Sequence, residues 1–148
     1  MSALARPASD PAAGPQALLR IGAVAMRLGV SERTLRYYEE IGLLTPSGHS
    51  PGGSRRYAQR DLDRVVRIRE LQSLMGFNLE EIHAVLSTED RLEGIRAEWR
   101  RSGEPARHRE LLEKGLEAVE EMQSEVRSKI QRLSSFLEEL DAKARRYR

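Results

Sequence analysis

The fold is decided by residues 31–41, which read Ser31-Glu-Arg-Thr-Leu-Arg-Tyr-Tyr-Glu-Glu-Ile41. Leu35, Tyr38 and Ile41 recur at the spacing of one helix face, so we expect them to be buried. Ser31 is a suitable N-cap, and Gly42 follows the last apolar residue. The segment therefore predicts a short helix whose Arg, Thr and remaining Tyr side chains face outward.

The outward face of this helix carries groups that are able to bind DNA. Arg can hydrogen-bond to guanine edges or to phosphates, and hydroxyl groups can bond to phosphates. These groups lie toward the N-terminal half of the helix, which is the half that enters a major groove. The candidate contacts here are Arg33, Thr34, Arg36 and Tyr37. The same pattern is also typical of a solvated helix face.

The flanking segments favour the DNA-binding interpretation. The spacing of apolar residues predicts a helix over Ile21–Leu28, and with the 31–41 helix it forms a helix-turn-helix. The Pro- and Gly-rich stretch that follows predicts a small hairpin with strands at Leu43–Thr45 and Arg55–Tyr57. Its cationic and hydroxyl-bearing side chains are suited to contact the phosphate backbone of DNA. These residues are Arg55, Arg56 and Tyr57. An ordinary basic loop is the alternative.

Three more helices are expected before the C-terminal region. The first covers Gln59–Met75. The second begins at Asn78, where Glu81 completes a capping box, and ends near Leu86. The third, over Glu89–Arg101, is short and amphipathic, and Gly103 and Pro105 follow it.

From Pro105 to Tyr147 the sequence predicts one long helix of about 43 residues, or roughly 65 Å. An apolar heptad runs along it without a slip, and we call its members the heptad stripe. They are Leu112, Leu116, Val119, Gln123, Val126, Ile130, Leu133, Leu137 and Leu140. A single helix cannot bury so narrow a stripe, so we expect self-association as a coiled coil. Gln123 is the one polar member, and it either fixes the register or is polar by chance.

The composition bounds the remaining possibilities. The chain has 148 residues, a net charge of +2 and no cysteine, which excludes disulfides and thiolate chemistry. No run reaches the roughly 18 apolar residues of a membrane helix, and the N-terminus has no signal-peptide core, so we expect a cytoplasmic protein. Residues 20–69 hold ten Arg and five acidic residues, whereas residues 89–121 hold ten acidic and seven basic residues. The excess of basic residues over residues 20–69 favours a module that binds a polyanion.

Five motifs together resemble the MerR family of bacterial transcription regulators. They are Ile21-Gly-Ala-Val-Ala, Thr34-Leu-Arg-Tyr-Tyr-Glu, Gly42-Leu-Leu-Thr-Pro, Arg55-Arg-Tyr and Gly76-Phe-Asn-Leu-Glu-Glu-Ile82. The similarity runs without a gap from about Leu19 to Leu86. The resemblance implies a mainly α protein with a winged helix-turn-helix DNA-binding domain followed by a long C-terminal coiled-coil helix. It also implies a homodimer held by antiparallel pairing of that helix.

The resemblance further implies a mechanism. Two heads bind a pseudo-palindrome between the −35 and −10 promoter elements, and an effector lets the dimer distort the DNA for RNA polymerase. On this basis Arg36, Tyr37, Arg55 and Tyr57 are the leading DNA contacts. We expect a disordered leader over residues 1–17, the DNA-binding domain over 18–88, a linker helix over 89–103 and the coiled coil over 104–148.

Two departures from the family pattern stand out. The family usually places Ser or Thr at the position of Ala58, so a helix cap is lost. Cysteines that serve metal- and redox-sensing relatives are missing, and no histidine has a partner at ligand spacing, so we expect no metal and no cofactor. Trp99 is a possible effector contact, with core packing as the alternative.

No nucleophile–base pair or phosphate loop is visible, so we do not expect an enzyme. Two other classes remain open. One is an architectural DNA-binding protein without an effector, and the other is a protein-interaction adaptor that works through its coiled coil.

Overall fold

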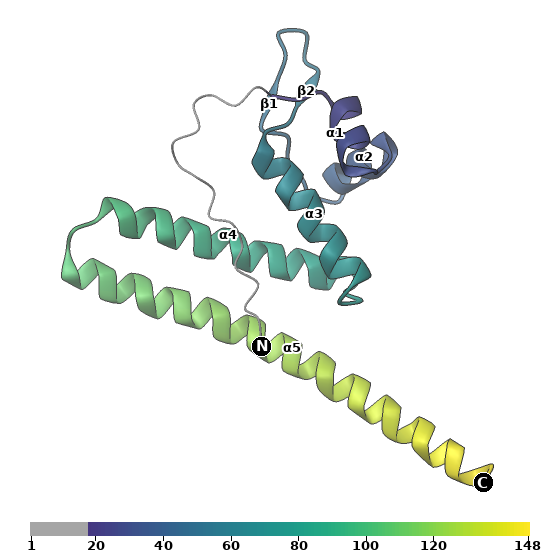
Figure 1. Ribbon diagram of the computed structural model, residues 1–148. Coiled ribbons are helices and arrows are strands. Elements are labelled where there is room, and N and C mark those ends of the chain that lie inside the picture. The colour runs from purple at the N-terminus through teal and green to yellow at the C-terminus, as the bar shows by residue number, and fades with distance from the viewer. Residues whose placement is uncertain (1–17) are drawn as a thin grey trace. The chain divides into compact units, whose positions relative to one another are not determined.

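A computed structural model describes residues 18–148 of the chain. The expected leader over residues 1–17 lies outside the described residues. The chain divides into two compact units between Gly76 and Phe77. We call residues 18–76 the head and residues 77–148 the hairpin, and each is described by itself (Figure 1). The architecture is mainly helical, with one small sheet, as the sequence predicts.

The head begins with α1 (Ile21–Leu28) and α2 (Glu32–Glu40), which form the predicted helix-turn-helix. Gly29 ends α1 in the left-handed conformation, with φ +65°, which favours glycine. The side chain of Ser31 accepts a hydrogen bond from the Thr34 amide at 3.0 Å and so caps α2. Leu35 and Tyr38 are buried, as their spacing predicts, whereas Ile41 follows the last residue of α2 and is half-buried.

The wing consists of β1 (Gly48–His49) paired antiparallel with β2 (Arg55–Arg56). The predicted first strand at Leu43–Thr45 is wrong. Leu43 and Leu44 are buried, and both of their amides donate to the Tyr38 carbonyl, at 2.9 and 3.2 Å. These two apolar residues close the C-terminal end of α2 against the core instead of joining the sheet.

The third helix of the head is α3 (Gln59–Ser73). Ala58 precedes it and provides no side-chain acceptor, as expected. Asp61 supplies the other half of a capping box, because its buried carboxylate accepts from the Ala58 amide at 2.8 Å and from the Ser47 amide at 3.1 Å. The same carboxylate therefore ties the start of α3 to the segment that leads into the wing.

The hairpin consists of α4 (Leu79–Arg101) and α5 (Pro105–Arg146), which run side by side in opposite directions (Figure 1). The prediction that one helix ends near Leu86 and another begins at Glu89 is wrong, since α4 is continuous. No glycine or proline lies between those residues to stop it. The capping box of Asn78 and Glu81 is confirmed, with bonds of 2.8 and 2.9 Å.

Contacts between α4 and α5 lie on a face of α5 that the sequence did not reveal. Leu111 and Ala118 are buried there, and a Cβ placed on Gly115 would lie 4.0 Å from Leu92 of α4. We call Leu111, Gly115 and Ala118 the hairpin seam. The heptad stripe lies on another face of α5, and most of its large side chains are exposed in the single chain.

A charged contact joins the start of α4 to the middle of α5. The Lys129 ammonium donates to both carboxylate oxygens of Glu81, at 3.0 and 2.8 Å. The hydrogen bond from Lys129, with the one from the Asn78 amide, lowers the pKa of Glu81.

Among residues 18–148, no helix combines the length and apolar content that crossing a membrane requires.

Candidate nucleic-acid interface

The outer face of α2 presents three of its four predicted contacts to solvent. Arg33, Arg36 and Tyr37 are exposed. Arg36 makes a long contact of 3.4 Å with Glu32, and this i,i+4 surface pair contributes little. Thr34 is half-buried, and its hydroxyl lies 2.9 Å from the Ser31 hydroxyl, so it takes part in the N-cap of α2.

Glu39 connects α2 to the wing. Its carboxylate lies 2.5 Å from the Arg55 guanidinium, and it also accepts a hydrogen bond from the Tyr57 hydroxyl. Only 10% of the Glu39 side chain is exposed, so this link is shielded from water. Glu39 therefore sets the position of the wing relative to α2. The charge of Glu39 gave no sign of this role in the sequence, although its spacing of four from Leu35 places it near the buried face of the helix.

Tyr57 lies in the core of the head and not on its surface. Its side chain is 0% exposed, and its hydroxyl is taken by Glu39. Burial first, and then the hydrogen bond to Glu39, raise the pKa of Tyr57 far above its usual value. The structure therefore speaks against the prediction that the Tyr57 hydroxyl contacts DNA, because a buried and partnered group is not available to a phosphate.

This placement leads to a test with Tyr57→Phe. Removing the hydroxyl takes one donor from a shielded carboxylate, so we expect the free energy of unfolding to fall by about 1–3 kcal/mol. Urea unfolding followed by circular dichroism measures this loss. Well below the unfolding transition, DNA affinity should remain close to that of the wild type. A variant with unchanged stability but much weaker DNA binding would return Tyr57 to the list of contacts.

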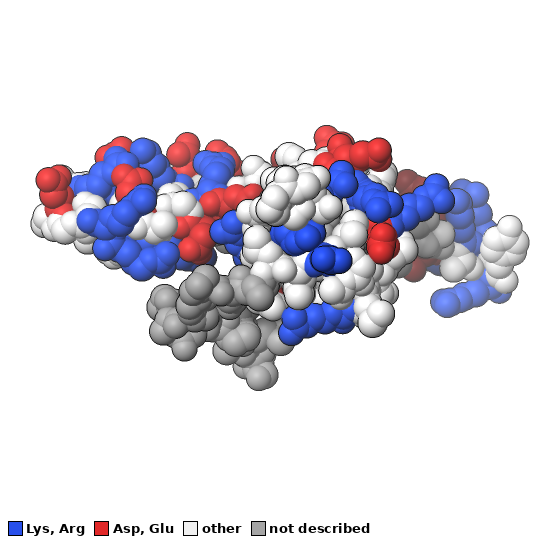
Figure 2. All heavy atoms as spheres, turned by 90° about the horizontal axis from the view of Figure 1, so that it is seen from above, with Lys and Arg blue, Asp and Glu red and all other residues white. Residues whose placement is uncertain are grey.

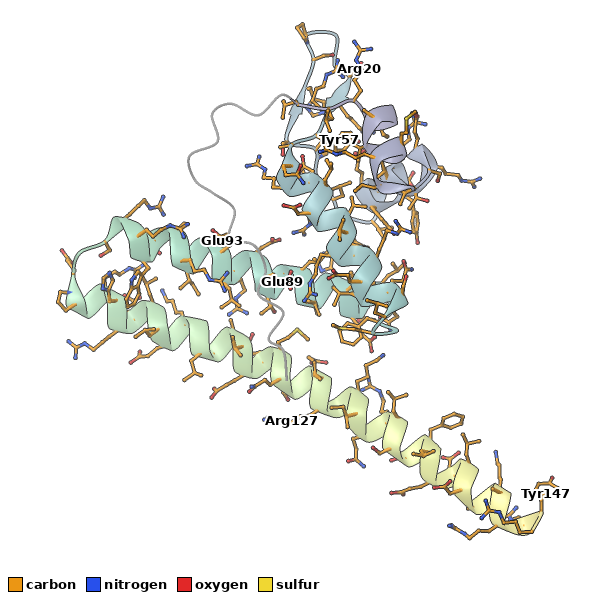
Figure 3. The ribbon with its side chains drawn as sticks, viewed as in Figure 1. Arg20, Tyr57, Glu89, Glu93, Arg127 and Tyr147 are labelled. Carbon is orange, nitrogen blue, oxygen red and sulfur yellow. The ribbon has the colours of Figure 1, made fainter. Side chains whose placement is uncertain are left out.

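A further exposed cation, which was not among the predicted contacts, lies beside the wing. Leu19 and Tyr57 exchange two backbone hydrogen bonds of 2.8 Å, so the chain before α1 runs antiparallel to the wing. Arg20 is therefore the neighbour of Arg56, and it is exposed. Figure 3 shows Arg20 beside the wing and Tyr57 inside the head. The signal that could have revealed Arg20 is its place immediately before the first helix.

The charges on the hairpin are arranged differently from those on the head. Acidic and basic residues are interspersed along α4 and α5, and Figure 2 shows red and blue side chains intermixed on the face that it presents. Many of them pair with each other, including Arg91 with Glu121 at 2.7 Å and Lys114 with Glu110 at 2.9 Å. Arg107 pairs with both Glu98 and Glu110. Mutual neutralisation leaves little field for a polyanion here, whereas Arg33 on the head makes no ion pair within residues 18–148.

Trp99 lies where α4 approaches the start of α5. Its ring stacks on the His108 ring, with centroids 3.8 Å apart and planes 10° from parallel. His108 Nε2 lies 2.6 Å from the Ser102 carbonyl oxygen, at the turn between the helices. The stack packs α4 against α5 next to the turn that joins them, and about a third of the Trp99 surface stays exposed. A metal site is a separate question, and within residues 18–148 there is no cluster of three or more acidic or His side chains that could hold a metal ion.

Comparison with known proteins agrees with this arrangement. Residues 19–89 match the family of MerR HTH family regulatory proteins. The HTH-type transcriptional regulator YfmP of Bacillus subtilis is 31% identical over 122 residues, which cover 82% of this chain and 87% of that protein. The HTH-type transcriptional activator TipA of Streptomyces coelicolor is 45% identical over 84 residues, 57% of this chain and 32% of that protein.

A solved structure extends the similarity beyond the head. A MerR family transcriptional regulator from Listeria monocytogenes aligns with a TM-score of 0.50 and 26% identity, and the alignment covers 87% of this chain and 85% of that one. The basic outer face of α2, the wing tied to it through Glu39, and these matches lead to one conclusion: the chain belongs to the MerR family of transcriptional regulators and carries its DNA-binding helix-turn-helix.

Proposed function

We propose that the protein regulates transcription as a homodimer that binds promoter DNA through its two heads. The observation that carries this proposal is the exposed cationic face of α2 beside the wing, in a chain that also exposes an apolar heptad stripe. One head reads only a half-site, and two heads related by a two-fold axis match a palindromic operator. In this proposal the DNA-binding region covers residues 18–88, which is the head with the first turns of α4, and the 104–148 helix holds the dimer.

The proposed contacts fall into two groups. Arg33, Arg36 and Tyr37 on α2 enter the major groove, where Arg can bond to guanine or to phosphate. Arg56 in the wing and Arg20 beside it contact the phosphate backbone of the DNA next to that groove. Arg55 points its guanidinium at Glu39, so we assign it mainly to positioning the wing. Thr34 serves the N-cap and can contact a phosphate only as a secondary partner.

Membership of the MerR family supports a specific mode of control. The dimer binds between the −35 and −10 elements and changes the bend and twist of the spacer, so that RNA polymerase can engage both elements. Transcription from a bound promoter with purified polymerase tests this mode. Binding without any change in transcript level would favour an architectural role, and failure to footprint any promoter would favour the adaptor role.

Arg36→Ala is the direct test of the interface. Losing one phosphate or base contact should weaken operator binding and reduce the slope of log K against log salt by roughly one unit. Gel shifts across a range of salt concentrations measure both quantities. Arg109→Ala is a matched control, since Arg109 is an exposed Arg on the hairpin and should leave the slope unchanged. If Arg36→Ala behaves like Arg109→Ala, the assignment of α2 as the recognition helix is wrong.

If an organic effector controls the protein, we propose that it binds beside Trp99. A ligand that favours one arrangement of the α4–α5 turn acts by differential affinity, and 1–3 kcal/mol is enough to change output. Trp99 is the only tryptophan, so its fluorescence reports events at this site alone. Trp99→Ala should abolish the response and leave basal DNA affinity nearly intact. An effector that still acts on the Trp99→Ala variant, and that leaves the indole emission of the wild type unchanged, binds elsewhere.

A further inference from the structure

The heptad stripe has flanking charges that decide how two copies fit together. Counting from Leu112 as position d, the g positions of α5 include Gly115 and Lys129, which lie against α4. The e positions lie on the opposite flank of the stripe. They are Glu113, Glu120, Arg127, Ser134 and Asp141. Over the part of α5 that packs against α4, only this flank is free to meet the charges of another helix.

Two of the e residues are exposed and carry opposite charges one heptad apart. Glu120 and Arg127 are both exposed, and neither makes an ion pair within residues 18–148. Arg127 projects from the side of α5 that faces away from α4 (Figure 3). Other charged residues of the hairpin, such as Arg91 and Glu121, are paired within the chain. Glu120 and Arg127 are thus left available to a partner.

We propose that α5 pairs antiparallel with a second copy in the one register that places Glu120 opposite Arg127 of the partner subunit. Two-fold symmetry then places Arg127 opposite the partner's Glu120, so the dimer gains two ion pairs. In antiparallel coiled coils the e positions of one helix face the e positions of the other, which is the geometry that these pairs need. The proposal rests on the homodimer of the proposed function and on the antiparallel pairing that the family resemblance implies, and it adds the register.

The charges disfavour the neighbouring arrangements. Sliding the helices by one heptad in one direction brings Arg127 against the partner's Arg127, and sliding in the other direction brings Glu120 against the partner's Glu120. Like charges in such positions are destabilising. In a parallel pair, g residues face e residues of the other chain, so that Met122 would meet the partner's Arg127 and Gly115 the partner's Glu120. No opposite charges would meet there.

The proposed register also suits the polar member of the stripe. The layers pair Leu112 with the partner's Leu137, Leu116 with the partner's Leu133, and Val119 with the partner's Ile130. The two central layers pair Gln123 with the partner's Val126, and their symmetry mates. The two Gln123 residues then lie about three residues apart along the axis, roughly 4.5 Å. Their amides can hydrogen-bond to each other, which satisfies a polar group that burial would otherwise penalise.

A charge-swap experiment tests the register in the full-length protein. Glu120→Arg and Arg127→Glu each replace both ion pairs of a homodimer with like-charge contacts, so each variant should dimerise at least about tenfold more weakly. Mixing the two variants restores both ion pairs, one with the wild-type signs and one with its signs reversed, and should give a heterodimer of wild-type affinity. The double variant Glu120→Arg/Arg127→Glu should also dimerise like the wild type. Glu117→Arg, at the outer b position, is the control for helix charge alone.

Sedimentation equilibrium of the single variants and their mixture gives a clear outcome. Preferential heterodimer formation supports the register. A mixture that stays no tighter than its components overturns it, while dimerisation of the wild type and DNA binding would still stand.

A second measurement does not depend on charge. The chain has no cysteine, so a spin label on Ser135→Cys is unique in each chain. The axial separation of the two labels should be about 32 Å, against about 21 or 42 Å in registers one heptad away. Pulsed dipolar spectroscopy separates these values, and a distance that fits either neighbour rejects the proposal.

Discussion

Leu133→Asp is expected to convert the protein to a monomer. Leu133 lies in the C-terminal part of α5, beyond the stretch that packs against α4. Its relative exposure in the single chain is 60%, so it contributes little to the fold of one copy. In the proposed dimer it is buried in the heptad stripe. A carboxylate placed there in both chains has no partner, and the combined cost is several kcal/mol. Sedimentation velocity at micromolar concentration should show a single species of monomer mass.

The same variant should lose most of its affinity for a palindromic operator. A dimer binds two half-sites at once, and the second contact benefits from a high effective concentration. A monomer keeps only the contacts of one head. Affinity for an isolated half-site should therefore stay near that of the wild type, and affinity for the full operator should fall by orders of magnitude.

Ser135→Asp is the matched control for this prediction. It places the same charge two residues away, outside the heptad stripe, where Ser135 is exposed. This variant should remain dimeric and bind the operator normally. If Leu133→Asp is also dimeric at micromolar concentration, another surface holds the two copies together.

Local signals in the sequence predicted the helix starts well. Ser31 and Asn78 cap their helices with the bonds that their side chains and spacing require. Gly29 adopts the left-handed conformation that ends α1. These features depend on a few neighbouring residues, so no tertiary information is needed to find them.

Features that depend on tertiary packing were harder to predict. The Pro- and Gly-rich stretch predicted an extended piece at Leu43–Thr45, but Leu43 and Leu44 enter the core beside the end of α2 and the wing forms further along. The expected break after Leu86 depended on a change in apolar pattern, and packing against α5 carries α4 through it. Propensity and pattern are weak guides where burial decides.

The candidate site shows the same division. Facing arguments placed Arg33, Arg36 and Tyr37 on the surface of α2, and they lie there. For the wing, charge and hydroxyl content could not distinguish an exposed Tyr from a buried one. Tyr57 is buried because its backbone pairs with Leu19 and its hydroxyl reaches Glu39, and both partners are distant in sequence.

The hairpin seam was missed because small residues form it. Ala118 and Gly115 let α4 approach α5 closely, but they give no strong apolar signal. The heptad stripe, with its large side chains, dominated the pattern instead. The helix α5 thus has two adjacent apolar faces with different tasks, one within the chain and one toward a second copy.

Leu111 and Leu112 are neighbours that separate these two tasks. Leu111 is 1% exposed and belongs to the hairpin seam, whereas Leu112 is 61% exposed and belongs to the heptad stripe. In the monomeric Leu133→Asp background, Leu111→Ala should lower the free energy of unfolding by about 2–5 kcal/mol, because it leaves a cavity between α4 and α5. Leu112→Ala in the same background should cost less than about 1 kcal/mol. Urea unfolding of the hairpin helices measures both.

In the dimeric wild-type background the contrast should change. Leu112→Ala now removes two apolar contacts between subunits, so it should weaken dimerisation and make the unfolding midpoint depend more strongly on protein concentration. Leu111→Ala should lower the midpoint at every concentration, because its cavity lies within each chain. If both variants behave alike in the monomeric background, the two faces are not separate, and the heptad stripe packs within the chain instead of against a second copy.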